Sequence, residues 1–263
     1  MASDLVRFLE KEDDKEEEYP DFDFFLYTKL EESREVCLSI LRNRMLPVQV
    51  RMSMCLALAR DLQHRIDRNK LCMVDKLLER YQKETAPEFF RQKLVEYRAD
   101  GTLRYIRMQG LLDVLTRLEV LKKDWPAYVA QACSTLYGSG AEAYDSNYKV
   151  FLQDVGSGAV WERYLEQLMV YFVFTYFCGA VYDGRAYAKM VLAAASTLLI
   201  EELVMAAWID SGCESQWKCG EAIVEIAHRY SREVEHSDDN LNLLEEMFAS
   251  EERFELEHLL SIL

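Results

Sequence analysis

At 263 residues, half of them hydrophobic, the chain can bury a large core, which excludes a disordered protein. Glycine and proline are scarce, with 10 and 4 residues, and no segment of any length alternates apolar and polar residues. We therefore predict an all-α protein, an irregular multi-helix bundle. The net charge of -15 argues against nucleic acid as a partner.

The charge is unevenly distributed along the chain. Between Leu41 and Trp125 there are 18 Lys and Arg against 11 Asp and Glu, an excess of 7 positive charges. The remaining residues carry 13 against 35, an excess of 22 negative charges. This division could give an anion-facing surface in the middle of the chain and an acidic surface that attracts a lysine-rich partner. It could equally reflect amphipathic helices whose charged faces are only solvated.

The N-terminal residues divide the chain into two parts. Residues 1–20 form an acidic segment that ends at Pro20, and residues 21–263 form a helical domain. The first residues lack the pattern of a secretory signal, basic and then apolar, which indicates a cytoplasmic protein. The seven cysteines are odd in number and widely spread, as expected of reduced thiols in that compartment.

Apolar residues recur at helical spacing through most of the domain. The expected helices, in chain order, cover residues 25–41, 47–62, 71–81, 87–97, 103–121 and 126–137. Two glycine pairs follow, Gly138 with Gly140 and Gly156 with Gly158. Neither pair follows a strand, so we interpret them as helix ends rather than as the phosphate-binding loop of a nucleotide fold.

The most apolar stretch, residues 164–209, predicts two long helices joined by a turn at 182–184. A membrane crossing would bury Glu166, Lys189 and the pair at 201–202, at roughly 2.5 to 3.5 kcal/mol for each charge near the bilayer centre. We therefore expect no membrane contact, and instead an antiparallel hairpin buried at the heart of the bundle. The aromatic residues between 171 and 177 are interpreted as packing.

Residues 230–240, YSREVEHSDDN, gather polar side chains between two apolar-periodic segments. Tyr230 shares the helical spacing of the apolar residues before it, so it belongs to a buried face. Ser237 or Asp238 is suited to cap the following helix. These assignments leave three further side chains of the break unexplained, namely Arg232, Glu235 and His236.

Two charge patterns lie in the same region. Glu225, Arg229 and Glu233 are four residues apart and predict an ion-pair ladder along one helix face. Glu-x-x-His occurs three times, at 225/228, 233/236 and 255/258, a spacing found in di-iron bundles. Those bundles take their motifs from different helices, whereas two of these share one helix, so we predict no metal site.

The stretch YSREVEHSDDNL closely resembles a signature near the C-terminus of the flagellin lysine N-methylase family. The apolar stretch 164–196 looks like that family's preceding helical hairpin, and REVCLSILRNRMLPVQVRM, residues 34–52, resembles the segment that opens its helical region. The resemblance covers roughly residues 24–244. Only the C-terminal signature is specific.

The resemblance implies a bacterial enzyme that transfers methyl groups from S-adenosylmethionine to lysine side chains of flagellin or another lysine-rich protein. Glu235, His236 and Tyr230 would then be catalytic, collecting the lysine and accepting its proton, and Arg232 would hold the cofactor carboxylate. Family members usually begin with a cysteine-rich segment thought to hold an iron–sulfur cluster. Because no cysteines cluster here, we expect no such cluster in this chain and regard a cysteine-rich segment as a candidate partner.

Two alternatives stay open at this point. The chain could be a non-catalytic helical protein-interaction module rather than an enzyme. Likewise, Arg232, Glu235 and His236 could form a buried structural network at the helix break. Our expectation is mixed: Arg232 is chiefly structural, whereas Glu235 and His236 face a groove beside the 171–177 helix.

Overall fold

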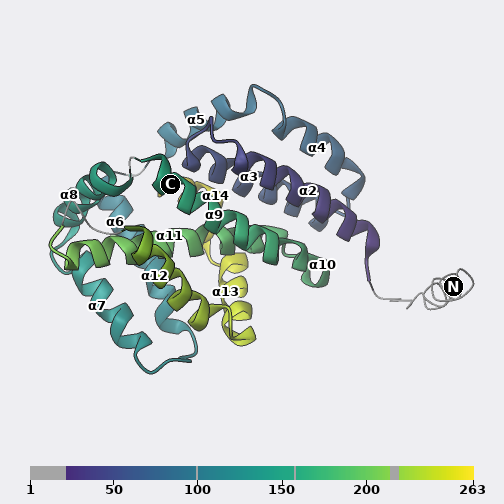
Figure 1. The fold of residues 1–263 in the computed structure, drawn as a ribbon. Coiled ribbons are helices and arrows are strands. Elements are labelled where there is room, and N and C mark those ends of the chain that lie inside the picture. Colours follow the sequence, from purple (N-terminus) through teal and green to yellow (C-terminus); the bar gives the residue numbers. More distant parts are fainter. Residues whose placement is uncertain (1–21, 99, 157, 214–218) are drawn as a thin grey trace, which may run out of the picture.

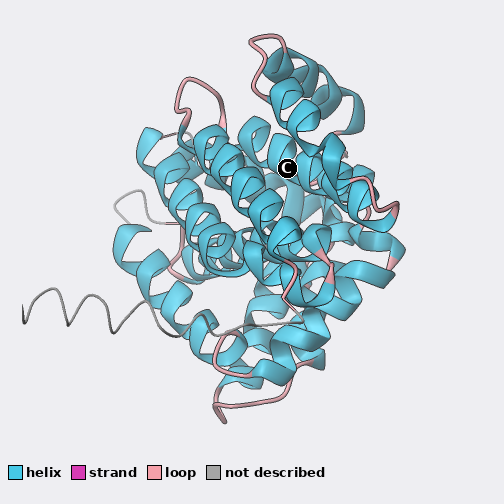
Figure 2. Ribbon diagram, turned by 90° about the vertical axis from the view of Figure 1, so that its right-hand side faces the viewer, coloured by secondary structure: helices cyan, strands magenta, loops and turns pink. Residues whose placement is uncertain are grey.

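The computed structural model describes residues 22–98, 100–156, 158–213 and 219–263, and within these ranges it contains helices and no strands (Figure 2). The all-α prediction is thus confirmed. The predicted acidic segment 1–20 lies outside the described residues. The helices are α2 (Phe24–Arg42), α3 (Val48–Asp67), α4 (Val74–Tyr81), α5 (Ala86–Tyr97), α6 (Gly101–Leu112), α7 (Trp125–Tyr137), α8 (Ala141–Phe151), α9 (Ala159–Tyr176), α10 (Ala180–Asp183), α11 (Ala186–Asp210), α12 (Cys219–Val234), α13 (Asp238–Ser250) and α14 (Leu256–Leu260).

Helix α11 runs through the centre of the molecule and contacts α3, α7, α9, α12 and α13 (Figure 1). It is apolar on all sides, and a helix of that kind is stable in water only when other elements surround it. In its most apolar window of 18 residues, 94% is buried inside the protein. Length and composition alone would allow α11 to span a membrane, but its apolar side chains are taken up by packing.

The α9–α11 hairpin forms as predicted. Helix α10 ends at Gly184, whose φ of +71° lies in the left-handed region that glycine adopts without strain, and the chain then reverses into α11. Only α11 is enclosed, however. The most apolar 18 residues of the stretch Ala159–Asp183 are only 39% buried. On the outer face of α9, Tyr171 and Phe174 are 48% and 60% exposed.

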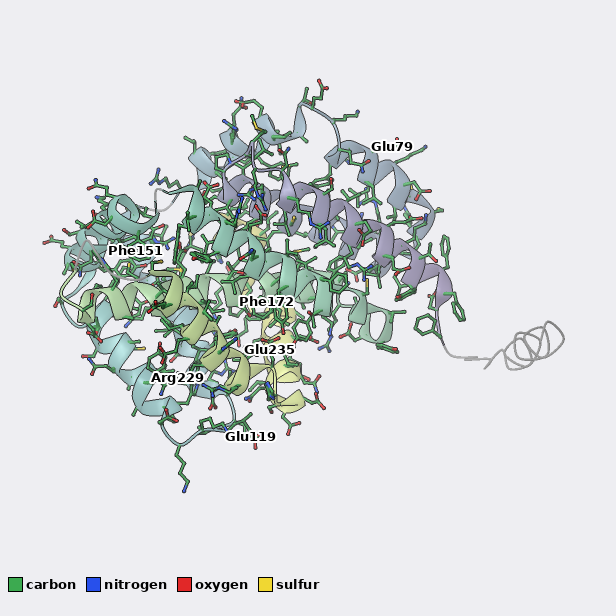
Figure 3. The ribbon with its side chains drawn as sticks, viewed as in Figure 1. Glu79, Glu119, Phe151, Phe172, Arg229 and Glu235 are labelled. Carbon is green, nitrogen blue, oxygen red and sulfur yellow. The ribbon has the colours of Figure 1, made fainter. Side chains whose placement is uncertain are left out.

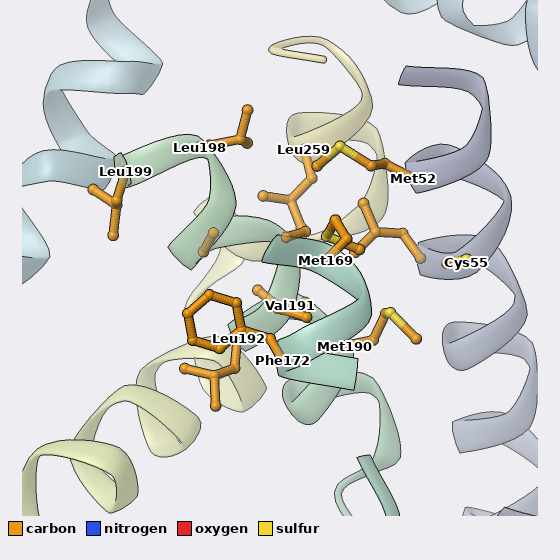
Figure 4. Packing of buried hydrophobic residues seen from close by; sticks show 14 of the residues in the cluster. Met52, Cys55, Met169, Phe172, Met190, Val191, Leu192, Leu198, Leu199 and Leu259 are labelled. Atoms are coloured by element: carbon orange, nitrogen blue, oxygen red, sulfur yellow. The ribbon is translucent and has the colours of Figure 1, made fainter. Parts of the chain in front are cut away.

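Methionines from several helices take part in the core beneath the hairpin, among more numerous leucines. Figure 4 shows Met52 of α3, Met169 of α9, Met190 of α11 and Leu259 of α14 meeting from four helices, and all four are at most 2% exposed. Methionine fills irregular gaps between helices that cross at different angles, which suits a bundle without regular symmetry.

A buried ion-pair cluster joins α3 to α9. The Arg51 guanidinium is fully buried, and it donates to Glu166 Oε2 at 2.7 Å and to the Leu41 carbonyl at 2.6 Å. Arg44 donates to the same carboxylate through two nitrogens, from Nη2 to Oε1 at 2.7 Å and from Nε to Oε2 at 3.0 Å. These hydrogen bonds, from Arg44 first and also from Arg51, lower the pKa of Glu166 despite its burial. The cluster therefore ties the segment at residues 34–52 to the apolar hairpin.

The glycine pairs lie at helix ends, as predicted. Gly138 ends α7, Gly140 precedes α8 with a φ of +86°, and Gly158 precedes α9. One predicted helix is too long: the expected helix 103–121 stops at Leu112 and continues as a 3-10 turn to Arg117. The analysis of the sequence also missed α8 and α14.

Candidate functional site

The signature stretch 230–240 forms the corner between α12 and α13. Five of its side chains are buried: Tyr230, Glu233, Val234, Ser237 and Asn240. Ser237 is the predicted cap of α13, and its hydroxyl accepts a hydrogen bond from the backbone N–H of Asn240 at 3.2 Å. Much of the signature therefore builds the corner itself.

Tyr230 is 1% exposed and points into the core. Its hydroxyl shares a 2.8 Å hydrogen bond with the Ser196 hydroxyl of α11, and its ring meets Phe172 of α9 edge to face. Burial raises the pKa of Tyr230 well above its ordinary value, so the hydroxyl keeps its proton at neutral pH. A catalytic role for Tyr230 in direct contact with substrate does not agree with this position, and we do not retain it.

Glu233 and Asn240 hold the loop between α6 and α7 against the corner. A carboxylate oxygen of Glu233 accepts from the Leu121 N–H at 3.0 Å. The amide of Asn240 accepts from the Glu119 N–H at 2.7 Å and donates to the carbonyls of Glu119 and Glu233 at 3.0 and 2.8 Å. The Asn240 amide thus bonds to backbone groups of both segments. One of them, at Glu119, is 121 residues away in the sequence, and the other, at Glu233, lies at the end of α12.

The predicted ion-pair ladder on α12 does not form. Arg229 turns away from Glu225 and pairs with Asp124 of the loop, and its guanidinium lies 4.0 Å from the centre of the Tyr128 ring. Glu233 is buried and takes the backbone partner described above. Partners distant in the sequence are closer here than the neighbours on the helix.

Glu235 lies at the end of α12, beside the helix that carries Phe172 (Figure 3). Its Oε2 accepts hydrogen bonds from the hydroxyls of Tyr171 and Tyr176, at 2.8 and 2.6 Å. Its Oε1 is shielded from water and has no hydrogen-bond partner among the described residues. This confirms the expected position of Glu235 beside the 171–177 helix. We call Tyr171, Tyr176 and Glu235 the carboxylate cluster.

The tyrosines of the carboxylate cluster act as donors. Burial first, and then the hydrogen bond and negative charge of Glu235, raise the pKa of Tyr171 to about 12, and they raise that of Tyr176 further. Neither hydroxyl loses its proton at neutral pH. A cation that approaches the cluster therefore meets the exposed ring of Tyr171 and the negative charge of Glu235, whose unpaired oxygen Oε1 lies beneath the surface.

Arg232 and His236 lie apart from this cluster, on the outer face of α12. With Glu225 and His228 they line a broad, open hollow of about 680 Å³. Arg232 is exposed and has no ion pair with any described residue, so the expectation that it is chiefly structural is wrong. Because Glu235 and His236 are consecutive, the hollow and the carboxylate cluster adjoin at the end of α12. The structure thus divides the four predicted site residues among the core, the carboxylate cluster and the hollow.

Two charged groups of the hollow could hold S-adenosylmethionine, the cofactor that the family resemblance implies. That molecule carries one carboxylate and two positive charges, and the hollow offers the unpaired guanidinium of Arg232 together with the carboxylate of Glu225. An iron–sulfur cluster does not fit. The cysteines are free thiols, and no group of three or more His, Cys, Asp or Glu side chains among the described residues could hold a metal ion.

Two members of the carboxylate cluster, Tyr171 and Tyr176, could not be recognised from the sequence. Their place in an aromatic stripe of a very apolar helix predicts packing. Their partner is 59 and 64 residues away along the chain, and helical periodicity gives no information at that range. The available signal was their hydroxyl groups, since a tyrosine in an otherwise apolar stripe usually finds a hydrogen-bond partner.

Comparison with known proteins agrees with the signature. A family model described as the FliB lysine N-methylase C-terminal domain matches residues 34–262. No curated protein and no solved structure gives a significant match. The match spans all the helices from the middle of α2 to α14, including the corner, the carboxylate cluster and the hollow. The chain therefore belongs to the FliB lysine N-methylase C-terminal domain family.

Proposed function

We propose that this chain is the helical part of a cytoplasmic protein-lysine N-methylase, and that its carboxylate cluster receives the substrate lysine. The observation that carries the proposal is Glu235, a carboxylate held by two tyrosine hydroxyls with its second oxygen unpaired. A lysine ammonium brings three donors and a positive charge, so it complements that oxygen. Tyr171 is the more exposed of the two tyrosines and is the side chain best able to move aside.

In this proposal the hollow holds the methyl donor. When bound, S-adenosylmethionine supplies an electrophilic methyl group. Arg232 would hold its carboxylate and Glu225 its ammonium group, while Glu235 orients the lysine amine and His236, at the junction, accepts the proton that the amine must lose. The tyrosine hydroxyls keep their protons at neutral pH because their pKa values are raised, so they cannot act as that base. Flagellin is the substrate that the family name suggests.

The cofactor part is tested by calorimetry of S-adenosylmethionine binding to the purified chain. Arg232 is exposed and unpaired, so Arg232→Ala should leave the melting temperature unchanged and weaken binding at least tenfold, since a charge-assisted contact is lost. Arg185→Ala, also at an exposed arginine, is the matched control. Binding that is absent in the wild type, or equal in the two variants, would remove the hollow from the proposal.

The substrate part is tested with a lysine-rich flagellin peptide. Glu235→Gln keeps the shape of the side chain but removes its charge, so peptide binding should fall at least tenfold while the fold persists. Glu246→Gln, at an exposed position of α13, should bind like the wild type. Undiminished binding by Glu235→Gln would contradict the assignment of the carboxylate cluster.

The alternative, a non-catalytic interaction module, is favoured by one observation, the exposed outer face of α9. Tyr171 and Phe174 stand out on it, and Arg34 of α2 lies 5.2 Å from the centre of the Phe174 ring. Such a face suits a partner protein, and a cysteine-rich segment is the partner that we propose. Phe174→Ala should weaken that association and leave cofactor binding intact. Methyl transfer by the purified chain would exclude a purely structural role.

A further inference from the structure

A cavity of about 450 Å³ lies among α5, α6 and α8, and neither the corner nor the carboxylate cluster contributes to it. Four positively charged side chains line it: Arg91 of α5, Arg98 just after α5, Arg104 of α6 and Lys149 of α8. Asp145 is the only Asp or Glu side chain in its lining, and it pairs with Lys149 at 2.5 Å. We call this space the basic cavity.

Arg104 is the buried anchor of the basic cavity. It is 7% exposed, and its guanidinium lies 3.9 Å from the centre of the Tyr148 ring. One nitrogen donates to the Ile262 carbonyl, and another is 3.5 Å from a carboxylate oxygen of Glu202. Its Nε has no hydrogen-bond partner among the described residues. A buried arginine with unused donor capacity is costly unless a ligand uses it.

Arg91 and Arg98 extend the positive charge to the mouth of the basic cavity. Arg91 lies on α5, and Arg98 is the residue that directly follows the end of α5 at Tyr97. Both are exposed, and neither forms an ion pair within the described part of the chain. Together with Arg104 they belong to the region between Leu41 and Trp125 that carries 7 excess positive charges in a protein of net charge -15. Three arginines of that region therefore converge on one enclosed space.

The walls of the basic cavity are apolar. Val50 of α3, Leu94 of α5 and Leu260 of α14 all contribute to the lining. Its volume is in the range of cavities that enclose small molecules. S-adenosylmethionine carries a net positive charge, so the two unpaired arginines at the mouth, Arg91 and Arg98, would repel it. A nucleic acid is disfavoured by the enclosed shape and by the negative charge of the rest of the chain.

We propose that the basic cavity binds a small organic phosphate, with its phosphate group on Arg104, Arg98 and Arg91 and its apolar part against Leu94 and Leu260. Arginine forks match phosphate oxygens in geometry as well as in charge. The free donor of Arg104 gives the site a buried anchor, and the exposed arginines give it electrostatic attraction. This site is independent of methyl transfer.

The test is calorimetry of the full chain with phenyl phosphate, and with phenol as the uncharged probe of the same shape. We expect saturable binding of one phenyl phosphate, at least tenfold weaker binding in Arg91→Ala and Arg98→Ala, and no saturable binding of phenol. Both variants change exposed side chains, so they should fold normally. Arg80→Ala and Lys93→Ala, which line a neighbouring cavity on the other side of α5, are the matched controls.

Four outcomes would overturn the proposal. Absence of saturable phenyl phosphate binding would show that the arginines do not form a site. Equal binding of phenol would show that charge is not recognised. Equal losses in the control variants would show that general electrostatics, and not the basic cavity, attracts the anion. Tighter binding of a phosphoserine peptide than of phenyl phosphate would replace the small molecule with a protein ligand.

Discussion

The residues of the signature stretch fall into two groups, one that holds the corner together and one that a ligand can reach. Tyr230, Glu233, Ser237 and Asn240 face inward and hold the corner between α12 and α13, while Arg232, Glu235 and His236 stay within reach of a ligand. Tyr230 and Glu233 share the inward face of α12 because residues three or four positions apart lie on one side of a helix, whereas Ser237 and Asn240 are turned inward by the corner that starts α13. One motif can therefore stabilise the fold and present a site.

Asn240→Ala should be among the most destabilising changes at the corner. The amide makes three buried hydrogen bonds to backbone groups, and their loss should lower the free energy of unfolding by about 3 kcal/mol, at ~1 kcal/mol for each bond. Urea unfolding measures the change. Asn242→Ala, at an exposed position of the same helix, should cost less than about 0.5 kcal/mol. Equal stabilities of the two variants would contradict the pinning role of Asn240.

Glu201 makes the stability of the fold depend on pH. It is buried in α11 and accepts one hydrogen bond from the Trp161 indole at 3.2 Å, and burial raises its pKa above the ordinary value of 4.5. The folded state therefore binds this proton more tightly than the unfolded state. The resulting stabilisation is complete below pH 4.5 and is lost as the pH rises through the folded-state pKa.

Glu201→Gln should remove that dependence, because the amide stays neutral and can still accept from the indole. Thermal melts at pH 5 and pH 8 should show a gain in melting temperature for Glu201→Gln at pH 8 and little change at pH 5. Glu246→Gln serves as the exposed control. A loss of stability that is equal at both pH values would show that the carboxylate is ionised and paired in the fold.

At the scale of elements, α3 and α9 are joined by charge as well as by apolar packing. Arg44 and Arg51 lie in the segment at residues 34–52, and their shared partner Glu166 lies in the apolar hairpin. The segment at residues 34–52 and the apolar hairpin each resemble a part of the family, and these ion pairs join them into one structural unit. This explains why charged residues persist in such an apolar region.

Glu166→Ala should break this unit. Removal of one partner leaves the fully buried guanidinium of Arg51 short of its main acceptor, at a cost of about 3 to 5 kcal/mol. Because the pKa of Glu166 is lowered in the fold, the stabilisation is present above the ordinary pKa of 4.5 and is lost as the pH falls. Chemical denaturation at neutral pH measures the loss. Glu35→Ala, which breaks an exposed pair with Arg34, should cost at most ~1 kcal/mol; a similar cost for both would contradict the account.

Helices whose pattern is local could be predicted from the sequence, and contacts between them could not. The Ser237 cap, the glycine boundaries and the hairpin turn each depend on a few adjacent residues. Helix α8 was missed because its buried positions are Tyr144 and Phe151 among polar neighbours, which gives a weak apolar pattern. Arg229 was assigned to a neighbour on its own helix, but its partner, Asp124, is 105 residues away.

At the scale of the whole molecule, opposite charges are gathered in different places. Three arginines of the region from Leu41 to Trp125 line the basic cavity among α5, α6 and α8, whereas the Glu235 carboxylate of the carboxylate cluster lies between the end of α12 and α9. A lysine-bearing protein and an anionic small molecule would thus be attracted to different surfaces of the same chain. The uneven charge of the sequence is an early sign of this division.

The most direct test of the central claim is mass spectrometry of flagellin after incubation with the purified chain, S-adenosylmethionine and a separately supplied cysteine-rich segment from a family member. The account predicts that flagellin lysines gain methyl groups with the wild-type chain and with Glu246→Gln, but not with Glu235→Gln. Unmethylated flagellin in the presence of the folded wild-type chain, or equal methylation by Glu235→Gln, would contradict it.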